Sequence, residues 1–257
     1  MGGPLWSPAG WGGGRVSASV DAYWAQQTAI FKVSQLPSGA LDLNVEGRRG
    51  LSPLQGFGQM WQKIFRVRLK DIEVSPTEVI RTWKENFPQF WPKGSRFHAP
   101  LTGIAPGEVA LLRLVPGGMP LSTGVMVLYA DDESFTLMTP QGHVFAGWIT
   151  FSAYQEDNCT VAQASMLIRA DDPIYEIAMR LGGHKAENKF WIHTLTALAA
   201  HFQVDAEVEA SVTCLDKKVQ WSEARNIWQN AGLRTMLYTM GAPLRWVRKK
   251  GKRRGQV

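Results

Sequence analysis

The sequence predicts an α+β protein in which a run of antiparallel strands packs against one long helix. Between residues 109 and 169, short apolar segments alternate with tight-turn signals at intervals of about ten residues, which is typical of an antiparallel meander. The chain then enters a helical segment in which Trp191, Leu195, Leu198 and Phe202 share one face. That face needs an apolar partner, and the meander is the only large one available.

The residues before the meander predict a strand followed by a helix. Polar and apolar side chains alternate in part over residues 61–70, as they do in a strand. Ser75 then suits the N-cap of a helix and Pro76 its first position, while Glu78 can close a capping box. Pro88 ends this helix, and a second short helical turn follows it.

The meander is expected to contain five strands, with a shorter strand ahead of them at 96–102. Each strand ends at a cluster of Pro, Gly, Asp or Asn, the residues that tight turns favour. The five strands cover residues 109–115, 124–129, 134–138, 144–154 and 160–169. In the strand 144–154, Phe145 and Phe151 share one face while Trp148 and Tyr154 share the other. Either face could be the one that meets the helix.

The long helix has clear start and interruption signals. Asp172 can serve as its N-cap with Pro173 at the first helical position. The pair Gly182 and Gly183 should break or kink it, because glycine is a poor residue for a helix interior.

Three parts of the chain follow from these elements. Residues 1–60 form a flexible, glycine-rich N-terminal segment with a short helix within 20–33. Residues 61–204 form the main domain. Residues 205–257 form a helical C-terminal extension, with a helix at 222–239 and a basic tail after it.

Several short motifs give the domain a resemblance to a known family. They are residues 139–143 (TPQGH), 145–148 (FAGW), 172–176 (DPIYE) and 190–191 (FW). Together with the order of elements over residues 61–204, they resemble a bacterial branch of the START/Bet v 1-like superfamily, also called SRPBCC and similar to polyketide cyclases and lipid-transport proteins.

The resemblance implies a helix-grip fold, in which a curved antiparallel sheet wraps around a long C-terminal helix and leaves an apolar cavity between them. Members of the superfamily bind lipids, steroids or polyketides, and a minority catalyse cyclisation or dehydration. No catalytic motif is common to the fold, so the resemblance assigns no catalytic residue. It implies no cofactor and no metal.

The positive charge of the chain is concentrated near its end. The formal net charge is +6, yet residues 245–254 carry seven Lys and Arg and no acidic residue, so the remaining chain is at −1. The residues expected to contact a membrane or another polyanion are Trp246, Arg248, Lys249, Lys250, Lys252, Arg253 and Arg254. This composition suits an anionic membrane surface, whereas nucleic acid would be bound only nonspecifically. A solvated tail is an equally good interpretation.

The sequence shows no secretory signal, no membrane span and no CxxC pair of cysteines. Residues 1–20 lack the continuous apolar segment of a secretory signal, and no stretch has the roughly 18 apolar residues of a membrane span. Cys159 and Cys214 form no CxxC pair. The expected location is the cytoplasm, with peripheral attachment to the membrane as an addition.

Six residues are candidates for contact with a ligand in the cavity, and each has a simpler alternative. Arg113 and Gln163 are polar residues within apolar strands, although outward-facing positions would explain them. His143 could act as a base at a strand end, but an exposed turn histidine is the simpler interpretation. The remaining candidates are the aromatic residues Trp148, Tyr154 and Trp191.

Two groups of titratable residues are weaker candidates. Asp171 and Asp172 form an acidic pair, which we interpret as solvated turn residues. His184, Glu187 and His193 lie near one another in sequence, but their spacing does not complete a metal site, so no metal is predicted.

Three functions are compatible with these patterns. The first is the binding or carriage of a small apolar ligand, such as a lipid or a polyketide-like compound, in an internal cavity. The second is a cyclase or dehydratase reaction in the same cavity. The third is an interaction with membrane surfaces through the basic tail.

Overall fold

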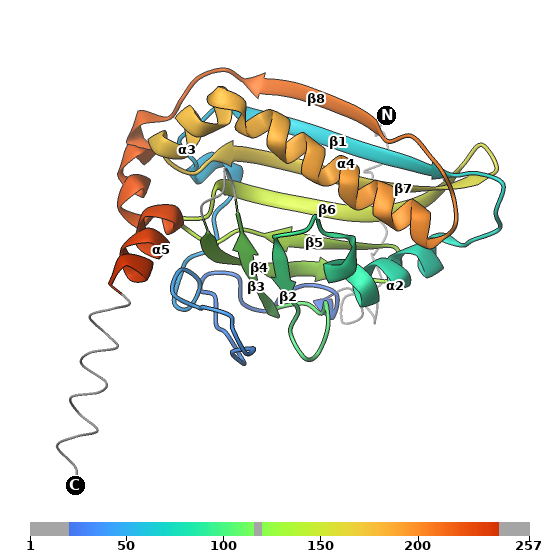
Figure 1. Ribbon diagram of the computed structural model, residues 1–257, viewed down its shortest axis with the longest axis horizontal. Helices are drawn as coiled ribbons and strands as arrows, with labels where there is room; N and C mark the ends of the chain where they lie inside the picture. Colours follow the sequence, from blue (N-terminus) through green and yellow to red (C-terminus); the bar gives the residue numbers. More distant parts are fainter. Residues whose placement is uncertain (1–20, 116–119, 242–257) are drawn as a thin grey trace, which may run out of the picture.

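The computed structural model describes residues 21–115 and 120–241, and they form one large antiparallel sheet with helices against it (Figure 1). The eight strands lie in the order β2-β3-β4-β5-β6-β7-β1-β8, and every neighbouring pair is antiparallel. Their bounds are β1 Met60–Leu69, β2 Arg96–His98, β3 Val109–Leu114, β4 Leu121–Ala130, β5 Ser134–Met138, β6 Phe145–Glu156, β7 Cys159–Ala170 and β8 Glu209–Asp216.

The helices cover one face of this sheet and one of its ends. Their bounds are η1 Pro53–Gln55, α2 Pro76–Asn86, η2 Phe87–Phe90, α3 Pro173–Ala178, η4 Met179–Gly183, α4 His184–His201, η5 Trp221–Gln229 and α5 Ala231–Met240. The long helix α4 packs along β1 and β7, while α2 packs on β6 and β7 (Figure 1). The predicted helix-grip α+β fold is confirmed. None of the described helices is long and apolar enough to cross a membrane.

The sequence signals for the helix ends correspond to real caps. The Ser75 hydroxyl accepts a hydrogen bond from the Glu78 backbone N–H at 3.1 Å, and Pro76 occupies the first position of α2. The Asp172 carboxylate accepts from two backbone N–H groups at the start of α3. Gly182, with φ of 117°, separates α3 from α4, as the glycine pair predicted.

The N-terminal segment differs from the prediction, because residues 22–33 contain no helix. Instead, the segment packs on the face of the sheet opposite α4 through turns and bends, with one isolated bridge from Trp24 to Tyr129 of β4 and another within the segment between Ile30 and Arg49. Phe31 and Val45 are fully buried there in a cluster with Met126. Burial of these side chains against the sheet stabilises this irregular conformation more than a short isolated helix could be stabilised by its own helix propensity.

The C-terminal extension also differs, since it begins with a strand rather than a helix. β8 pairs with β1 and extends the sheet by one strand. The helix expected at 222–239 is divided at Asn230 into η5 and α5. Asn230 accepts a hydrogen bond from the Leu233 N–H at 2.9 Å and so caps α5.

Candidate functional site

Strand register sets three rows of residues on the face toward α4, crossing β1, β7 and β6. The first row is Trp61, Ile168 and Gly147, the second is Lys63, Met166, Ile149 and Leu137, and the third is Phe65, Ala164, Phe151 and Phe135. The second and third rows continue into β5. The two halves of this face differ in how completely they are filled.

The half beneath α2 is packed solid with aromatic rings. Phe135 and Phe151 stack at 4.7 Å between ring centroids, and Phe87 and Trp83 meet Phe151 edge to face at 5.0 Å each. All four side chains are fully buried. Such pairs add to the stability that burial alone provides, and this half of the face leaves little room for a ligand.

The other half, which we call the Gly147 end, is lined by apolar side chains that are only partly buried. These are Trp61, Leu114, Phe145, Ile149 and Trp191. These side chains pack against the main core on one side and remain accessible to solvent on the other.

Gly147 itself cannot carry a side chain. Its φ is 146°, and a Cβ would lie 2.2 Å from the Leu167 carbonyl oxygen. The first row therefore has no side chain at its β6 position, between Phe145 and Ile149 on the same face.

A buried ion pair lies at the Gly147 end. Lys63, whose side chain is fully buried, contacts the Glu187 carboxylate on α4 and the Asn188 side-chain oxygen, the latter at 2.9 Å. Burial raises the pKa of Glu187, and the Lys63 charge opposes that rise. Since Lys63 and Glu187 compensate each other, this pair offers polar groups without net charge.

A second polar pair lies beside the first. The rings of Trp61 and His184 are 4.6 Å apart between centroids, and neither Trp61 Nε1 nor His184 Nδ1 has a hydrogen-bond partner among the described residues. Burial and the nearby Lys63 charge lower the pKa of His184 to about 4, so its imidazole is neutral at pH 7. The Gly147 end therefore combines apolar walls with uncharged or mutually compensated polar groups.

Sequence reasoning missed Lys63, although a signal was present. Lys63 has the same strand parity as Phe65, Val67 and Leu69, which all face α4. Glu187 likewise lies four residues before Trp191 on one helix face. In the structure Glu187 is the partner of Lys63 in an ion pair. Among the described residues, no group of His, Cys, Asp or Glu side chains is arranged to hold a metal ion.

Of the six predicted ligand contacts, only Trp191 lies at the Gly147 end. Its side chain hydrogen-bonds Glu187 of the buried ion pair, and its ring also meets Phe151, at the border with the packed half, at 5.6 Å between centroids. Trp148 and Tyr154 have the opposite strand parity to Phe151, so they face away from α4. They cannot line a space between α4 and the sheet.

Arg113 and Gln163 also lie outside the Gly147 end. Gln163 accepts a hydrogen bond from Arg66 at 2.7 Å on the face opposite α4, and Arg113 is exposed. Both agree with the simpler, outward-facing interpretation.

His143 is not the exposed turn residue that the sequence favoured. It is buried, and its Nδ1 accepts a hydrogen bond from the Phe145 backbone N–H at 3.0 Å. Burial lowers the pKa of His143 to about 4, which keeps the ring neutral. His143 therefore fixes the turn before β6.

The prediction that the acidic pair is solvated is also wrong. Asp171 and Asp172 are both fully buried. Asp171 accepts hydrogen bonds from the Gly142 backbone N–H at 2.8 Å and from the Asn226 side chain at 3.0 Å. Asp172 accepts from the Asn230 side chain at 2.7 Å. The pair joins the end of β7 to the C-terminal extension.

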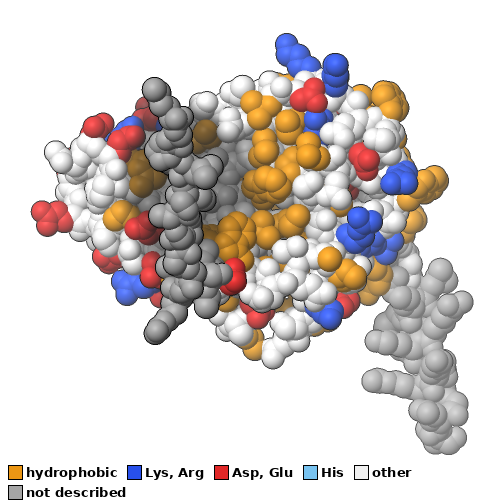
Figure 2. Space-filling model, turned by 180° about the vertical axis from the view of Figure 1, so that it is seen from behind, with side chains coloured by type: hydrophobic (Ala, Val, Ile, Leu, Met, Phe, Trp, Pro, Cys, Tyr) orange, Lys and Arg blue, Asp and Glu red, His pale blue; other side chains and the backbone are white. Residues whose placement is uncertain are grey.

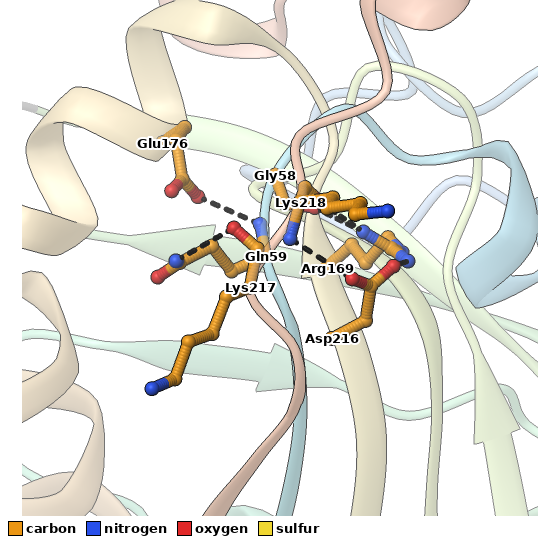
Figure 3. Close-up of polar contacts among 7 residues, drawn as sticks. All are labelled: Gly58, Gln59, Arg169, Glu176, Asp216, Lys217 and Lys218. Carbon is orange, nitrogen blue, oxygen red and sulfur yellow. Dashed lines mark hydrogen bonds and ion pairs between the residues drawn. The ribbon is translucent and has the colours of Figure 1, made fainter.

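Arg169 makes a second junction at the same end of β7 (Figure 3). Its guanidinium donates to the carbonyl oxygens of Gly58 at 2.6 Å and Lys218 at 3.0 Å, and it pairs with Asp216 at 2.5 Å. This buried arginine holds together the segment before β1, the end of β7 and the end of β8.

Two of the hollows bounded by described residues lie away from the Gly147 end. The larger, of about 680 Å³, lies between the end of β1 and residues 203–209 and has mixed polar and apolar walls. The smaller, of about 170 Å³, lies beside His98, Arg113 and Thr235. The predicted tail contacts, Trp246 to Arg254, lie outside the described residues.

Comparison with solved structures finds matches that cover a little more than half of this chain. A START superfamily protein from Mycobacterium smegmatis is 20% identical, with a TM-score of 0.38 over 57% of this chain and 98% of that chain. Ara h 8.0201 is 11% identical, with a TM-score of 0.40 over 56% of this chain and 98% of that one. The di-domain ARO/CYC StfQ of the steffimycin biosynthetic pathway is 10% identical, with a TM-score of 0.40 over 58% of this chain and 51% of that one.

These likenesses concern the fold of the domain alone. No protein-family model matches the sequence. No curated protein matches it either.

Proposed function

We propose that the protein binds a small, mainly apolar ligand at the Gly147 end, between α4 and the sheet. The observation that carries this proposal is the partial burial of Phe145, Ile149 and Trp191 on the face toward α4. Apolar side chains on the core-facing side of a sheet are normally covered completely, and a ligand would complete their burial.

The polar groups at the Gly147 end favour a ligand with few charges. Because Lys63 and Glu187 compensate each other and His184 is neutral at pH 7, the site carries little net charge. A long acyl chain, a sterol-like ring system or an aromatic polyketide with few charges suits such walls better than a charged metabolite.

Native mass spectrometry before and after solvent denaturation tests the proposal directly. We expect the purified full-length protein to carry a discrete extra mass that denaturation removes, or to bind one equivalent of the apolar dye 1-anilinonaphthalene-8-sulfonate. The absence of both a retained mass and saturable dye binding would overturn the proposal.

A pair of isoleucine variants locates the binding. Ile149→Trp should weaken dye binding by about tenfold or more, because the added volume fills the Gly147 end. Ile192→Trp is the matched control, since Ile192 is an exposed residue of α4. Thermal unfolding verifies that both variants fold, and Ile149→Phe provides a smaller enlargement. Equal binding by all variants would place the dye elsewhere and contradict the proposed site.

A further inference from the structure

The helix α5 has its apolar face turned to solvent. Leu233, Met236, Leu237 and Met240 follow the i, i+3, i+4, i+7 spacing of one helix face, and all four are exposed. Leu237 is 65% exposed and Met240 69%. The buried side of the helix instead carries Ala231 and Thr235. This arrangement reverses the usual orientation of a surface helix, in which the apolar face meets the core.

The preceding element, η5, has the same reversed orientation. Trp221 is 75% exposed and Trp228 79%, whereas Asn226 is buried. Within the extension, η5 and α5 are attached to the domain through the polar side chains of Asn226, which bonds to Asp171, and Asn230, which bonds to Asp172, and through the small apolar residue Ala231. Trp221 meets Phe57 of the domain edge to face at 5.3 Å between ring centroids yet stays largely exposed, and Trp228, Leu237 and Met240 are exposed as well.

The sequence of the extension indicates the charge of a partner that would cover these side chains. Residues 217–257 contain eleven Lys and Arg and a single acidic residue, Glu223, which gives this part +10 and leaves −4 for the rest of the chain. Figure 2 shows hydrophobic side chains projecting at the end of the molecule where η5 and α5 lie, with Lys and Arg side chains among them. Exposed Trp beside many cations is the composition that anionic bilayer surfaces favour.

We propose that η5 and α5 form a docking surface for an anionic lipid membrane, with Trp221, Trp228, Leu237 and Met240 entering the interface. This surface is independent of ligand binding at the Gly147 end. The proposed contact lies in the described part of the extension, where the exposed cations Lys217, Lys218 and Arg225 add electrostatic attraction.

Other partners fit these observations less well. A second copy of the chain, docked through the same surface, would bring two strongly cationic segments together. Nucleic acid would satisfy the cations but would leave the aliphatic side chains of α5 without an apolar partner. An anionic bilayer satisfies both kinds of side chain.

Vesicle sedimentation with the full-length protein tests the docking surface. We expect the protein to sediment with vesicles of phosphatidylcholine containing phosphatidylserine, and much less with phosphatidylcholine alone. The double variant Leu237→Ser/Met240→Ser should reduce binding to the anionic vesicles by at least about tenfold, because two apolar contacts are lost. Leu101→Ser, which changes an exposed leucine outside the extension, should leave binding unchanged.

Three results would overturn the proposal. The first is full vesicle binding by the double variant, with circular dichroism confirming that it is folded. The second is an absence of vesicle binding together with tight binding of an RNA or DNA oligonucleotide. The third is a dimer in sedimentation velocity that depends on Leu237 and Met240 and ignores vesicles. None of these results bears on dye binding at the Gly147 end, so the two proposals fail separately.

Discussion

At the scale of single residues, the Lys63–Glu187 pair is the most consequential feature that sequence patterns left unnoticed. A lysine between Gln62 and Ile64 resembles one more exposed strand residue, yet Lys63 is fully buried beneath α4. A buried charge is tolerated only when a partner compensates it, so each member of the pair depends on the other.

The variant Lys63→Met should therefore lower the free energy of unfolding by about 3–5 kcal/mol, because it leaves the Glu187 carboxylate buried without its partner. Urea unfolding followed by circular dichroism measures this loss. The double variant Lys63→Met/Glu187→Gln should recover most of it, while Lys185→Met, at an exposed position of α4, should change stability by less than about 0.5 kcal/mol. A Lys63→Met protein as stable as the parent would show that the pair contributes little.

Which side chains face α4 could be predicted from the sequence only in part. Alternation in β6 separates Phe151 from Trp148 and Tyr154 correctly, but two faces with aromatic residues look alike until the helix is placed. Trp191 was identified because helical spacing puts it in phase with Leu195 and Leu198. His143 was misjudged because burial of a turn depends on distant segments, which local sequence does not encode.

At the scale of elements, the strands of the meander and the caps of α2 and α3 follow from local signals. β8 was missed because most of its side chains are exposed and it pairs with only one neighbour, so it lacks an apolar pattern. The N-terminal segment was mistaken for a helix because its apolar residues pack on the outer face of the sheet, which is a tertiary effect. Both errors concern elements whose conformation depends on the assembled sheet.

The junction between β7 and η5 gives stability a pH dependence. Burial raises the pKa of Asp171 to about 8, well above its value in an unfolded chain. The folded protein therefore retains a proton that the unfolded chain has already lost between about pH 4 and pH 8. Over that interval the contribution of Asp171 to stability falls as the pH rises.

Urea unfolding at a series of pH values from 7 to 9 measures this effect. Below about pH 7 the unfolded chain protonates His143 and His184, whose pKa values burial lowers to about 4 in the fold, and this opposes the effect of Asp171. The parent protein should lose stability with rising pH, and Asp171→Asn should reduce that slope because the variant has no proton to release there. The nearby Asp172, whose pKa burial also raises, should leave a residual slope in the variant. Asp205→Asn, at an exposed position, should behave as the parent does. An unchanged slope in Asp171→Asn would exclude Asp171 as its source.

At the scale of the whole molecule, the candidate ligand site and the docking surface are adjacent. Phe145 packs on the main core and also on a second apolar cluster. That cluster contains Tyr175 of α3, Met179 of η4 and Ala231 of α5. The apolar Gly147 end therefore lies next to the extension. If both proposals hold, an apolar ligand would be exchanged close to the membrane and would cross little water.

The central claim is that the Gly147 end, rather than the packed half beneath α2, receives the ligand. Methyl NMR spectra of isoleucine, recorded during titration with a stearic acid that carries a nitroxide near its end, test it most directly. The nitroxide should broaden the Ile149 methyl signals at low ligand ratios and more strongly than those of Ile80, which is fully buried in α2. Broadening of Ile80 with Ile149 unaffected, or no specific broadening at all, would contradict it.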